Sequence, residues 1–304
     1  MREEQKWPVK CKMRRLLVTG ASGLLGSRIV EIAREDYDVI PLHNTKPLHT
    51  DSLKLDITNR KEVFNLFRKA KPDVLIHTAA ETNVDKCETQ RKLAWKINVE
   101  GTRNVAEACS EANAKMVYVS TDYVFNGEKG LYIEEDAPNP INHYGITKLE
   151  GEDQVKKTCK THVILRTSVL YGWHPYKRNF ATWVINSLKQ KKKISIIKDH
   201  FNTPTLADNL AEMTIEAVQK DLQGLYHASG SQRISRYEFA QQIAKAFNLN
   251  QSLIKPTKMN QMAAWTARRP KDSSLNINKI RELLKTKPLN ITEGLGKMKE
   301  SAHP

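Results

Sequence analysis

The sequence lacks the features that mark membrane-spanning, disulfide-rich and metal-binding proteins. No apolar run approaches the ~20 residues that a membrane-spanning helix needs. The four cysteines, Cys11, Cys87, Cys109 and Cys159, form no Cys-x-x-Cys pair and show no metal-ligand spacing. We therefore expect a reduced, cytoplasmic protein that has no metal site and does not act at a membrane.

The chain also lacks an internal repeat, a low-complexity segment and an apolar signal core at its start. Residues Met1–Lys12 are polar, so we expect a disordered extension there, with Met13 as a candidate start. The 304 residues suffice for one large domain or for a domain with a smaller lobe. Hydrophobic residues make up 39% and charged residues 27%, as is typical of a globular protein.

Positive charge is in excess, because 49 Lys and Arg face 34 Asp and Glu, a net charge of +15. Such an excess suits nucleic acid, a membrane surface or small polyanionic ligands. The densest run, Lys189–Lys193, lies between a helical pattern and an apolar run, which favours a solvated turn. The sequence has no zinc spacing, aromatic sheet motif or basic heptad helix, so we expect no nucleic-acid partner.

Short apolar runs alternate with apolar residues at helical spacing along most of the chain. This alternation predicts an α/β fold with a doubly wound, parallel Rossmann sheet covered by helices on both faces. The longest helical stripe, from Leu93 to Cys109, predicts a single long helix. The predicted strands are Arg15–Val18, Val39–Leu42, Val74–Ile76, Met116–Val119, Val163–Leu165 and Leu225–Tyr226.

The order of these elements predicts two lobes in one interwoven unit. Residues 13–170 form the dinucleotide-binding domain, and residues 171–304 form a smaller C-terminal substrate-binding lobe. Residues 224–229 return to the sheet. We expect cofactor and substrate to share the cleft between the two lobes.

A glycine-rich turn directly follows the first predicted strand and opens an amphipathic helix. Gly20 permits the tight turn, Gly23 lets a pyrophosphate approach the backbone, and Gly26 lets the helix pack on the strand. The start of the helix then offers free N–H groups to phosphate. The predicted pyrophosphate-binding residues are Gly20, Ser22, Gly23, Leu24, Leu25 and Gly26.

The end of the second strand usually reports the choice of dinucleotide, because a carboxylate there binds the ribose 2′-hydroxyl of NAD. This chain has His43, Asn44, Thr45 and Lys46 at that point, and no carboxylate. Lys46 or Arg28 is then available to a 2′-phosphate. We therefore favour NADP, with NAD as the alternative and Asn44 as a cofactor contact.

Further cofactor contacts are expected along the following segments. Asp56, with Ile57, is a candidate for the adenine end, although Asp56 equally suits a helix cap before Thr58–Lys61. The small residues Thr78, Ala79 and Ala80 follow a strand, which suits a cofactor lying against the strand ends. Asn98 is a candidate anchor for a water in a proton relay, and the alternative is a polar residue satisfied within its helix.

The segment Tyr144–Lys148 places a phenol and an ammonium on one helical face, four residues apart. A free tyrosine holds its proton to about pH 10, and a nearby cation lowers the pKa of a phenol. We therefore predict that Tyr144 protonates an alkoxide, that Lys148 lowers the Tyr144 pKa and holds the nicotinamide ribose, and that Thr121 orients the reacting oxygen. All three act beside a nicotinamide cofactor that supplies hydride.

The glycine turn, Ser120–Tyr123 and Tyr-x-x-x-Lys, in this order, resemble the extended short-chain dehydrogenase/reductase family. From about Met13 to Glu300 the chain is similar, within it, to the dTDP-4-dehydrorhamnose reductase family. The similar segments are Ala79–Glu88, Ser120–Gly127, Tyr144–Glu152, Arg166–Ser168, Asn179–Phe180, Asp199–Thr205 and Ala267–Asn276.

This resemblance implies reduction of the C4 ketone of dTDP-4-dehydro-L-rhamnose to dTDP-L-rhamnose. It also implies that Val84 and Tyr123, with Thr121 and Asp122, contact the sugar. By the same resemblance Asn179, Arg268 and Arg269 face the nucleotide, and Arg matches pyrophosphate oxygens bidentately. Some members of the family are homodimers, so a homodimer is open here.

Two departures concern the sugar. The family usually has a tryptophan where this chain has Val169, and Trp173, four residues later, is the candidate substitute. The loop Gly172–Arg178 also differs from the glycine-rich loop of the family.

A second resemblance points to a different class of function. Gly224–Asn248 is similar to the family of regulatory beta subunits of methionine adenosyltransferase, which keeps this fold and binds NADP as a partner protein. That family retains the Ser/Thr, Tyr and Lys residues, so these do not separate the two readings. A reductase or epimerase of another nucleotide sugar is the third alternative.

Overall fold

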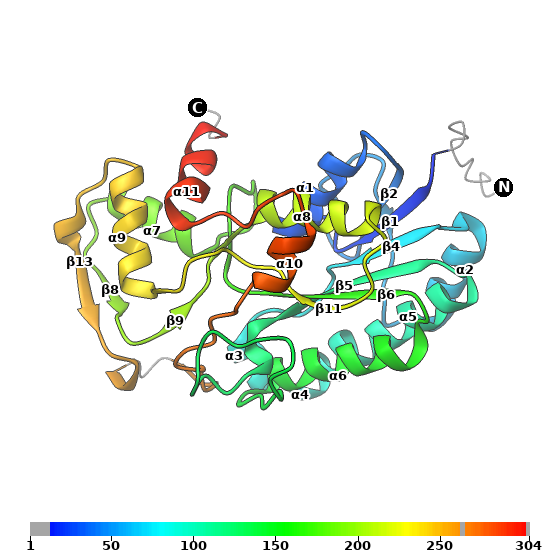
Figure 1. The fold of residues 1–304 in the computed structure, drawn as a ribbon, viewed down its shortest axis with the longest axis horizontal. Coiled ribbons are helices and arrows are strands. Elements are labelled where there is room, and N and C mark those ends of the chain that lie inside the picture. The colour runs from blue at the N-terminus through cyan, green and yellow to red at the C-terminus, as the bar shows by residue number, and fades with distance from the viewer. Residues whose placement is uncertain (1–12, 262–264, 302–304) are drawn as a thin grey trace.

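The fold is built on a seven-stranded parallel sheet, seen in a computed structural model that describes residues 13–261 and 265–301. The predicted extension Met1–Lys12 lies outside the described residues. The strand order is β11-β6-β5-β4-β1-β2-β3, which confirms the predicted doubly wound sheet (Figure 1). The strands are β1 (Arg15–Thr19), β2 (Asp38–His43), β3 (Leu53–Lys54), β4 (Val74–His77), β5 (Lys115–Thr121), β6 (His162–Thr167) and β11 (Gly224–His227).

Helices cover both faces of the sheet, because alternate residues of each strand point to opposite sides. In β1, Leu16 and Val18 pack with α1 (Leu24–Ala33) and α8 (Ala207–Gln219). Leu17 between them packs on the other face with α2 (Arg60–Ala70) and α5 (Thr102–Glu111). α6 (His143–Thr158) joins this second face (Figure 1). The middle residues of the central strands, such as 16–18 in β1 and 74–76 in β4, are therefore apolar, as both faces of a parallel sheet are buried.

The helix predicted from Leu93 to Cys109 is present in the structure, but it contains a π-helical turn. It consists of α4 (Arg91–Trp95), a π-helical turn over Lys96–Gly101, and α5. The turn contains Asn98, whose side chain bonds outside the helix, to Glu81 and Thr147. π-helical turns arise where one extra residue is inserted, often at functional sites. Apolar spacing does not reveal such an insertion.

The C-terminal part of the chain has its own apolar core, and one of its strands returns to the sheet. β11 pairs with β6 at the edge of the sheet. The assignment of residues 13–170 and 171–304 to separate lobes stays a prediction. The additional core joins α7 (Phe180–Lys189), β8 (Ile194–Ile197), α9 (Arg236–Ala246), β13 (Ile254–Thr257) and α11 (Ile291–Glu300).

The remaining elements are short. Within residues 13–261 and 265–301, no helix combines the length and apolarity that crossing a bilayer requires. The other α-helices are α3 (Val84–Thr89) and α10 (Asn278–Leu283). The two-stranded pairs are β8 with β13, β7 (Leu170–Tyr171) with β10 (Thr205–Leu206), and β9 (Phe201–Asn202) with β12 (Ile234–Ser235).

A single phenol organises the loop after β5. The backbone N–H groups of Gly127, Glu128 and Lys129 donate to the Tyr132 hydroxyl at 3.1, 3.0 and 3.1 Å. That hydroxyl donates in turn to Asn126 Oδ1 at 2.6 Å. The oxygen therefore accepts from three successive backbone donors of this loop, of which Glu128 N has Asn126 Oδ1 as a second acceptor at 3.2 Å.

Removing this oxygen should destabilise the protein. We expect Tyr132→Phe to lower the free energy of unfolding by about 1–3 kcal/mol, because the three donors lose their acceptor. Chemical denaturation measures the change. Tyr226→Phe is the matched control, since its hydroxyl makes no hydrogen bond to any described residue. Equal stability of the two variants would show that the phenol oxygen does not hold the loop.

Candidate active site

The carboxyl ends of four neighbouring strands bring the predicted site residues to one edge of the sheet. Thr19 at the end of β1 pairs with His77 at the end of β4. Thr121 at the end of β5 pairs with Thr167 at the end of β6. The segments that directly follow β1, β4 and β5 therefore emerge side by side, as expected for ligand sites of open α/β sheets.

The glycine turn has the shape that a dinucleotide pyrophosphate requires. Gly20 has φ of 70°, and a Cβ there would lie 2.8 Å from Ala79 N and from Thr78 Oγ1. A Cβ on Gly26 would collide with the Gly20 carbonyl. Gly23 caps α1 without a side-chain bond, so the first N–H groups of the helix remain free for an anion. The turn therefore fits the cofactor.

The remaining residues of this turn contribute differently. Leu25 is 4% exposed and packs in the core, so only its backbone faces the turn. Ser22 and Leu24 are half-buried. Thr78 donates to Thr19 O at 2.7 Å, and Ala79 and Ala80 remain partly exposed beside it.

The residues proposed to bind the 2′-phosphate differ in whether a carboxylate of the protein already binds them. Arg28 is bound by Asp208 and Glu31, so its charge is already matched. Asn44 and Lys46 are exposed after β2. The Lys46 ammonium lies 4.0 Å from the centre of the Tyr176 ring. Of the two cations proposed, Lys46 is thus the one without a carboxylate partner among the described residues.

Asp56 closes a turn rather than capping a helix. Its Oδ1 accepts from Thr58 N and Thr58 Oγ1, both at 2.9 Å. The cap of α2 is Asn59, so the cap predicted for Asp56 is wrong. Ile57 is buried, and its carbonyl accepts from Asn104 Nδ2 at 3.0 Å.

Asn98 is 1% exposed and fully engaged by the protein. Its Oδ1 accepts from Glu81 N at 2.8 Å, and its Nδ2 donates to Glu81 O at 3.1 Å and to Thr147 Oγ1 at 3.0 Å. It fixes the strand-following segment against α6. This geometry gives no support to a water anchor, and it differs from the alternative as well, because the partners of Asn98 lie outside its own helix.

Tyr144 lies in the first turn of α6, next to Thr121. Asn142 caps this helix by accepting from Gly145 N at 2.8 Å. Burial raises the pKa of Tyr144, and a hydrogen bond with the Thr121 hydroxyl opposes this rise. The lowered pKa that the Tyr-x-x-x-Lys spacing predicts is therefore wrong for this structure, because burial and the nearby Asp122 charge outweigh the Thr121 hydrogen bond. The phenol is held in its protonated form.

Lys148 lies one turn further along the same helix. Its Nζ donates to Val119 O at 2.8 Å and lies 4.0 Å from the centre of the Tyr118 ring. Burial lowers the pKa of Lys148 to about 7, and Glu152 partly opposes this. The ammonium therefore titrates near neutrality, in the range useful for proton transfer.

Asp122 organises the site from inside. Asp122 is 2% exposed, and its carboxylate accepts from Thr121 Oγ1 at 3.1 Å, Ser168 Oγ at 2.8 Å and Ser273 Oγ at 2.6 Å. Asn202 Nδ2 lies at 3.4 Å. Burial raises the pKa of Asp122, and these donors oppose the rise. Its predicted contact with substrate has no geometric support, because its oxygens are occupied within the protein.

A cavity of about 340 Å³ opens beside Tyr123, whose ring centre lies 6.0 Å from that of Tyr144. Two guanidinium groups, Arg236 and Arg269, share this cavity with aromatic and aliphatic side chains. Such a mixture suits a flat ring joined to an anionic group. The lining residues are Tyr123, Phe180, Trp183, Ser195, Ile196, Ile197, His200, Arg236, Trp265 and Arg269.

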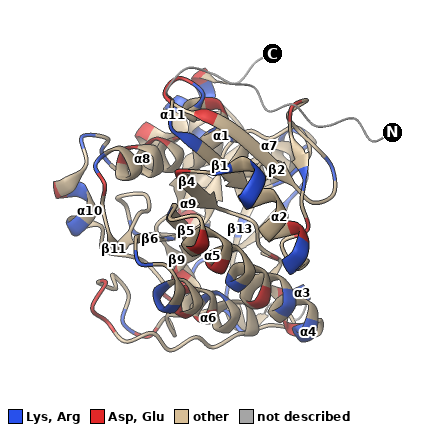
Figure 2. Cartoon of the chain, turned by 90° about the vertical axis from the view of Figure 1, so that its right-hand side faces the viewer, with Lys and Arg blue, Asp and Glu red and all other residues tan. Residues whose placement is uncertain are grey.

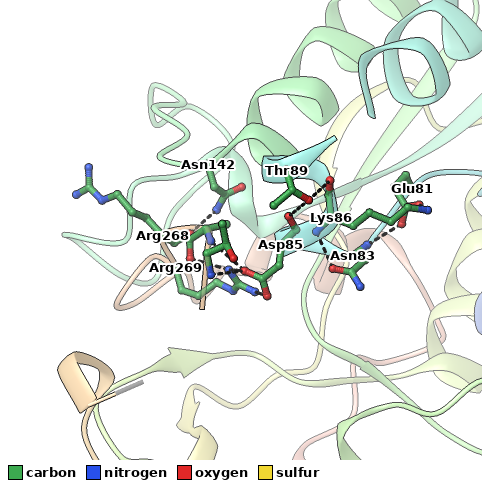
Figure 3. Close-up of polar contacts among 10 residues, drawn as sticks. Glu81, Asn83, Asp85, Lys86, Thr89, Asn142, Arg268 and Arg269 are labelled. Carbon is green, nitrogen blue, oxygen red and sulfur yellow. Dashed lines mark hydrogen bonds and ion pairs between the residues drawn. The ribbon is translucent and has the colours of Figure 1, made fainter. Parts of the chain in front are cut away.

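Of the residues predicted for the nucleotide, only Arg269 reaches this cavity. Arg268 is exposed and points away, while its carbonyl accepts from Asn142 Nδ2 at 2.9 Å (Figure 3). Asn179 caps α7 and donates to Gly172 O at 2.7 Å. Val84 begins α3 and is half-buried outside the cavity lining.

Arg269 is oriented by a carboxylate that is distant in the sequence and adjacent in the fold. Asp85 in α3 accepts from Arg269 Nη1 at 2.9 Å and Nη2 at 2.7 Å (Figure 3). The same carboxylate accepts from Thr266 N and Ala267 N at 3.0 and 2.9 Å. These bonds lower the pKa of Asp85, with the Arg269 bond as the largest cause. Asp85 thus holds the whole segment against α3.

Sequence reasoning missed Arg236, Trp183, Trp265 and His200. Arg236 directly follows the helix cap Ser235, where a cation is unfavourable to the helix dipole. That misplaced charge was an available signal. Trp173, the proposed tryptophan substitute, does not line this cavity, because its Nε1 donates to Met298 O at 2.6 Å and its ring packs on Phe247.

Comparisons with known proteins agree with this geometry. The family model described as the RmlD substrate binding domain matches residues 13–303. The dTDP-4-dehydrorhamnose reductase of Aggregatibacter actinomycetemcomitans is 32% identical, over 91% of this chain and 95% of that protein. The methionine adenosyltransferase 2 subunit beta of Rattus norvegicus is also 32% identical, over 90% of this chain and 84% of that protein.

A solved structure of a dTDP-4-dehydrorhamnose reductase also matches this chain. The dTDP-4-dehydrorhamnose reductase of Bacillus anthracis, in complex with NADP, is 36% identical with a TM-score of 0.87, and the match covers 95% of this chain and 100% of that one. The chain therefore belongs to the RmlD family, the NAD(P)-dependent oxidoreductases of the dTDP-4-dehydrorhamnose reductase type.

Proposed function

We propose that this chain uses NADPH to reduce the C4 ketone of a nucleotide sugar, converting dTDP-4-dehydro-L-rhamnose to dTDP-L-rhamnose. One observation carries the proposal. The protonated phenol of Tyr144 lies between the edge that bears the glycine turn and the cavity that contains two arginines. A proton donor in that place serves a substrate whose ketone meets the cofactor while its pyrophosphate reaches the arginines.

The cavity supports a nucleotide as the rest of the substrate. Trp183 and Trp265 offer ring faces to a base, and Arg236 and Arg269 offer planar donors to a pyrophosphate. Arg236 also lies over the Phe180 ring, 4.9 Å from its centre, which fixes its direction. The relatives named above support dTDP as the nucleotide.

The cofactor assignment rests on the glycine turn and on the end of β2. The turn fits a pyrophosphate, and the exposed, unpaired Lys46 suits a 2′-phosphate better than a ribose hydroxyl. The NADP complex of the Bacillus anthracis relative agrees with this preference.

The chain's own residues then perform acid catalysis. When bound, NADPH supplies the hydride. When substrate binds, Thr121 turns its hydroxyl from Asp122 Oδ1 to the ketone oxygen, and Tyr144 transfers its proton to that oxygen as negative charge develops. Lys148 lies one helical turn away, so its ammonium stabilises the phenolate that remains. Closing this buried site against water strengthens each of these interactions.

The direct test is turnover. Purified protein should oxidise NADPH when dTDP-4-dehydrorhamnose is added, with weaker or no oxidation on ketones of other nucleotide sugars. Absorbance of NADPH follows the reaction. Absence of turnover together with tight binding to a methionine adenosyltransferase would replace this proposal with the regulatory one, which the 32% identity to the rat beta subunit keeps in view.

Tyr144→Phe should remove the acid without disturbing the cofactor site. We expect turnover to fall by about 10²–10⁴-fold, the usual contribution of a positioned acid, while the Kd for NADPH stays unchanged. Tyr37→Phe, a buried tyrosine beside α1, is the matched control. Near-normal turnover of Tyr144→Phe would assign the proton to another group.

The rate of hydride transfer should depend on pH through Lys148. Its pKa is lowered to about 7, so the ammonium is present below that pH and is lost as pH rises through it. We expect single-turnover reduction to slow as pH rises above about 7, because the cation that stabilises the phenolate disappears. A rate that is constant from about pH 6 to pH 9 would contradict this role.

Asp85→Asn should affect the sugar nucleotide only. Without the carboxylate, Arg269 loses its orientation, and we expect KM for the nucleotide sugar to rise about tenfold. The value of kcat and the Kd for NADPH should change little. Asp136→Asn, which breaks a surface pair with Lys129, is the matched control. A change confined to kcat would show that Asp85 acts on the chemistry instead.

A further inference from the structure

The segment Gly172–Arg178 lies over the glycine turn. A Cβ on Gly172 would meet Leu24 Cδ1 at 3.7 Å, and the His174 ring lies against the backbone of Ser22. A Cβ on Gly23 would lie 4.0 Å from the Lys177 ammonium. This loop is also where the sequence departs from the glycine-rich loop of the family that it resembles. The departure therefore faces the place where a dinucleotide pyrophosphate would lie.

Several hydrogen bonds hold the loop in this position. His174 Nδ1 accepts the backbone N–H groups of Tyr176 and Lys177 at 3.1 and 2.9 Å. Gly172 O accepts from Asn179 Nδ2 at 2.7 Å, which closes the loop at its far end. Trp173 Nε1 donates to Met298 O in α11. The loop is thus a fixed structure that presents Lys177, rather than a loose connection.

The loop brings together positive charge that no carboxylate matches. Lys177 and Arg178 form no ion pair with any described residue, and neither does Lys46. Lys46 comes from the end of β2 and lies over Tyr176, 4.0 Å from the ring centre. Residues 172–178 and 44–46 contain no Asp or Glu. Like charges in one place are unfavourable alone, and a bound polyanion offsets that cost.

The distances assign a different phosphate to each lysine. Phosphate oxygens accept from backbone N–H groups at about 2.9 Å, so a pyrophosphate on the Gly23 side of α1 comes within reach of Lys177. Lys46 follows the strand whose end meets the adenosine ribose in this fold, and Tyr176 fixes its direction. The Lys177 contact is available to NADPH and NADH alike, whereas the Lys46 contact is available only to NADPH.

We propose that Gly172–Arg178 is a cofactor clamp, in which Lys177 binds the pyrophosphate and Lys46, placed by Tyr176, binds the 2′-phosphate of NADPH. The clamp rests on the cofactor part of the proposed function and is independent of the sugar. Lys177 thereby sets overall affinity for the dinucleotide, and Lys46 sets the preference for NADPH over NADH.

Calorimetric titration with NADPH and with NADH, without any sugar nucleotide, tests the clamp directly. Lys177→Met should weaken both cofactors to a similar extent, by about tenfold, as expected for one charge-assisted contact. Lys46→Met should weaken NADPH about tenfold and leave NADH within about twofold. Lys255→Met, an exposed lysine on β13, is the matched control and should change neither Kd. Thermal unfolding of each variant checks that the fold is intact.

Measuring the Kd for both cofactors distinguishes the possible outcomes. The clamp would be overturned if Lys177→Met bound NADPH and NADH with Kd values within about twofold of those of the wild type. Loss of NADPH binding alone in that variant would overturn the assignment of Lys177 to the pyrophosphate. Equal effects of Lys46→Met on the two cofactors would overturn its assignment to the 2′-phosphate. Failure of sugar turnover with these affinities as expected would leave the clamp standing and remove only the proposed substrate.

Discussion

The buried carboxylate of Asp122 is the interaction on which the site depends. It receives hydrogen bonds from Thr121 at the end of β5, Ser168 after β6 and Ser273 near the C-terminus. A buried charge is costly unless several donors satisfy it, so these segments must be in place together. One carboxylate thereby fixes the ends of β5 and β6 to the segment that follows Arg269, the arginine proposed to bind substrate. A second carboxylate, Asp85, sets the direction of that arginine.

The titratable and cationic groups of the proposed site are placed for proton transfer and for binding anionic ligands. Burial holds Tyr144 protonated and brings Lys148 to a pKa near neutrality, which suits an acid and the cation that follows it. The cations over the glycine turn and in the cavity lie at the two places where polyanions would bind. Lys and Arg residues are scattered over many helices in Figure 2, and these two groups account for part of the +15 charge. The remainder has no structural explanation here.

Most of the fold could be predicted from the sequence, because local patterns determine it, and the roles of Thr121, Tyr144 and Lys148 stay predictions. Apolar runs gave the parallel strands, and the glycine turn and Tyr-x-x-x-Lys segment lie where the strand order requires. Tertiary burial could not be predicted in this way. It reverses the direction expected for the Tyr144 pKa, occupies Asp122 within the protein and places Arg268 outside the cavity. Arg236 and Lys177 were not predicted as site residues, because the elements around them meet only in the folded chain, although the charge of Arg236 at a helix start was a local signal.

The central claim is that hydride passes to a sugar ketone beside Tyr144. It is tested most directly with NADPH that carries deuterium at both C4 positions of the nicotinamide, supplied with dTDP-4-dehydrorhamnose. We expect one deuterium at C4 of the sugar in the product. Mass spectrometry would detect it, and the C4 proton signal of the sugar would be lost in NMR. A product without deuterium at C4, or deuterium at another carbon, would contradict it.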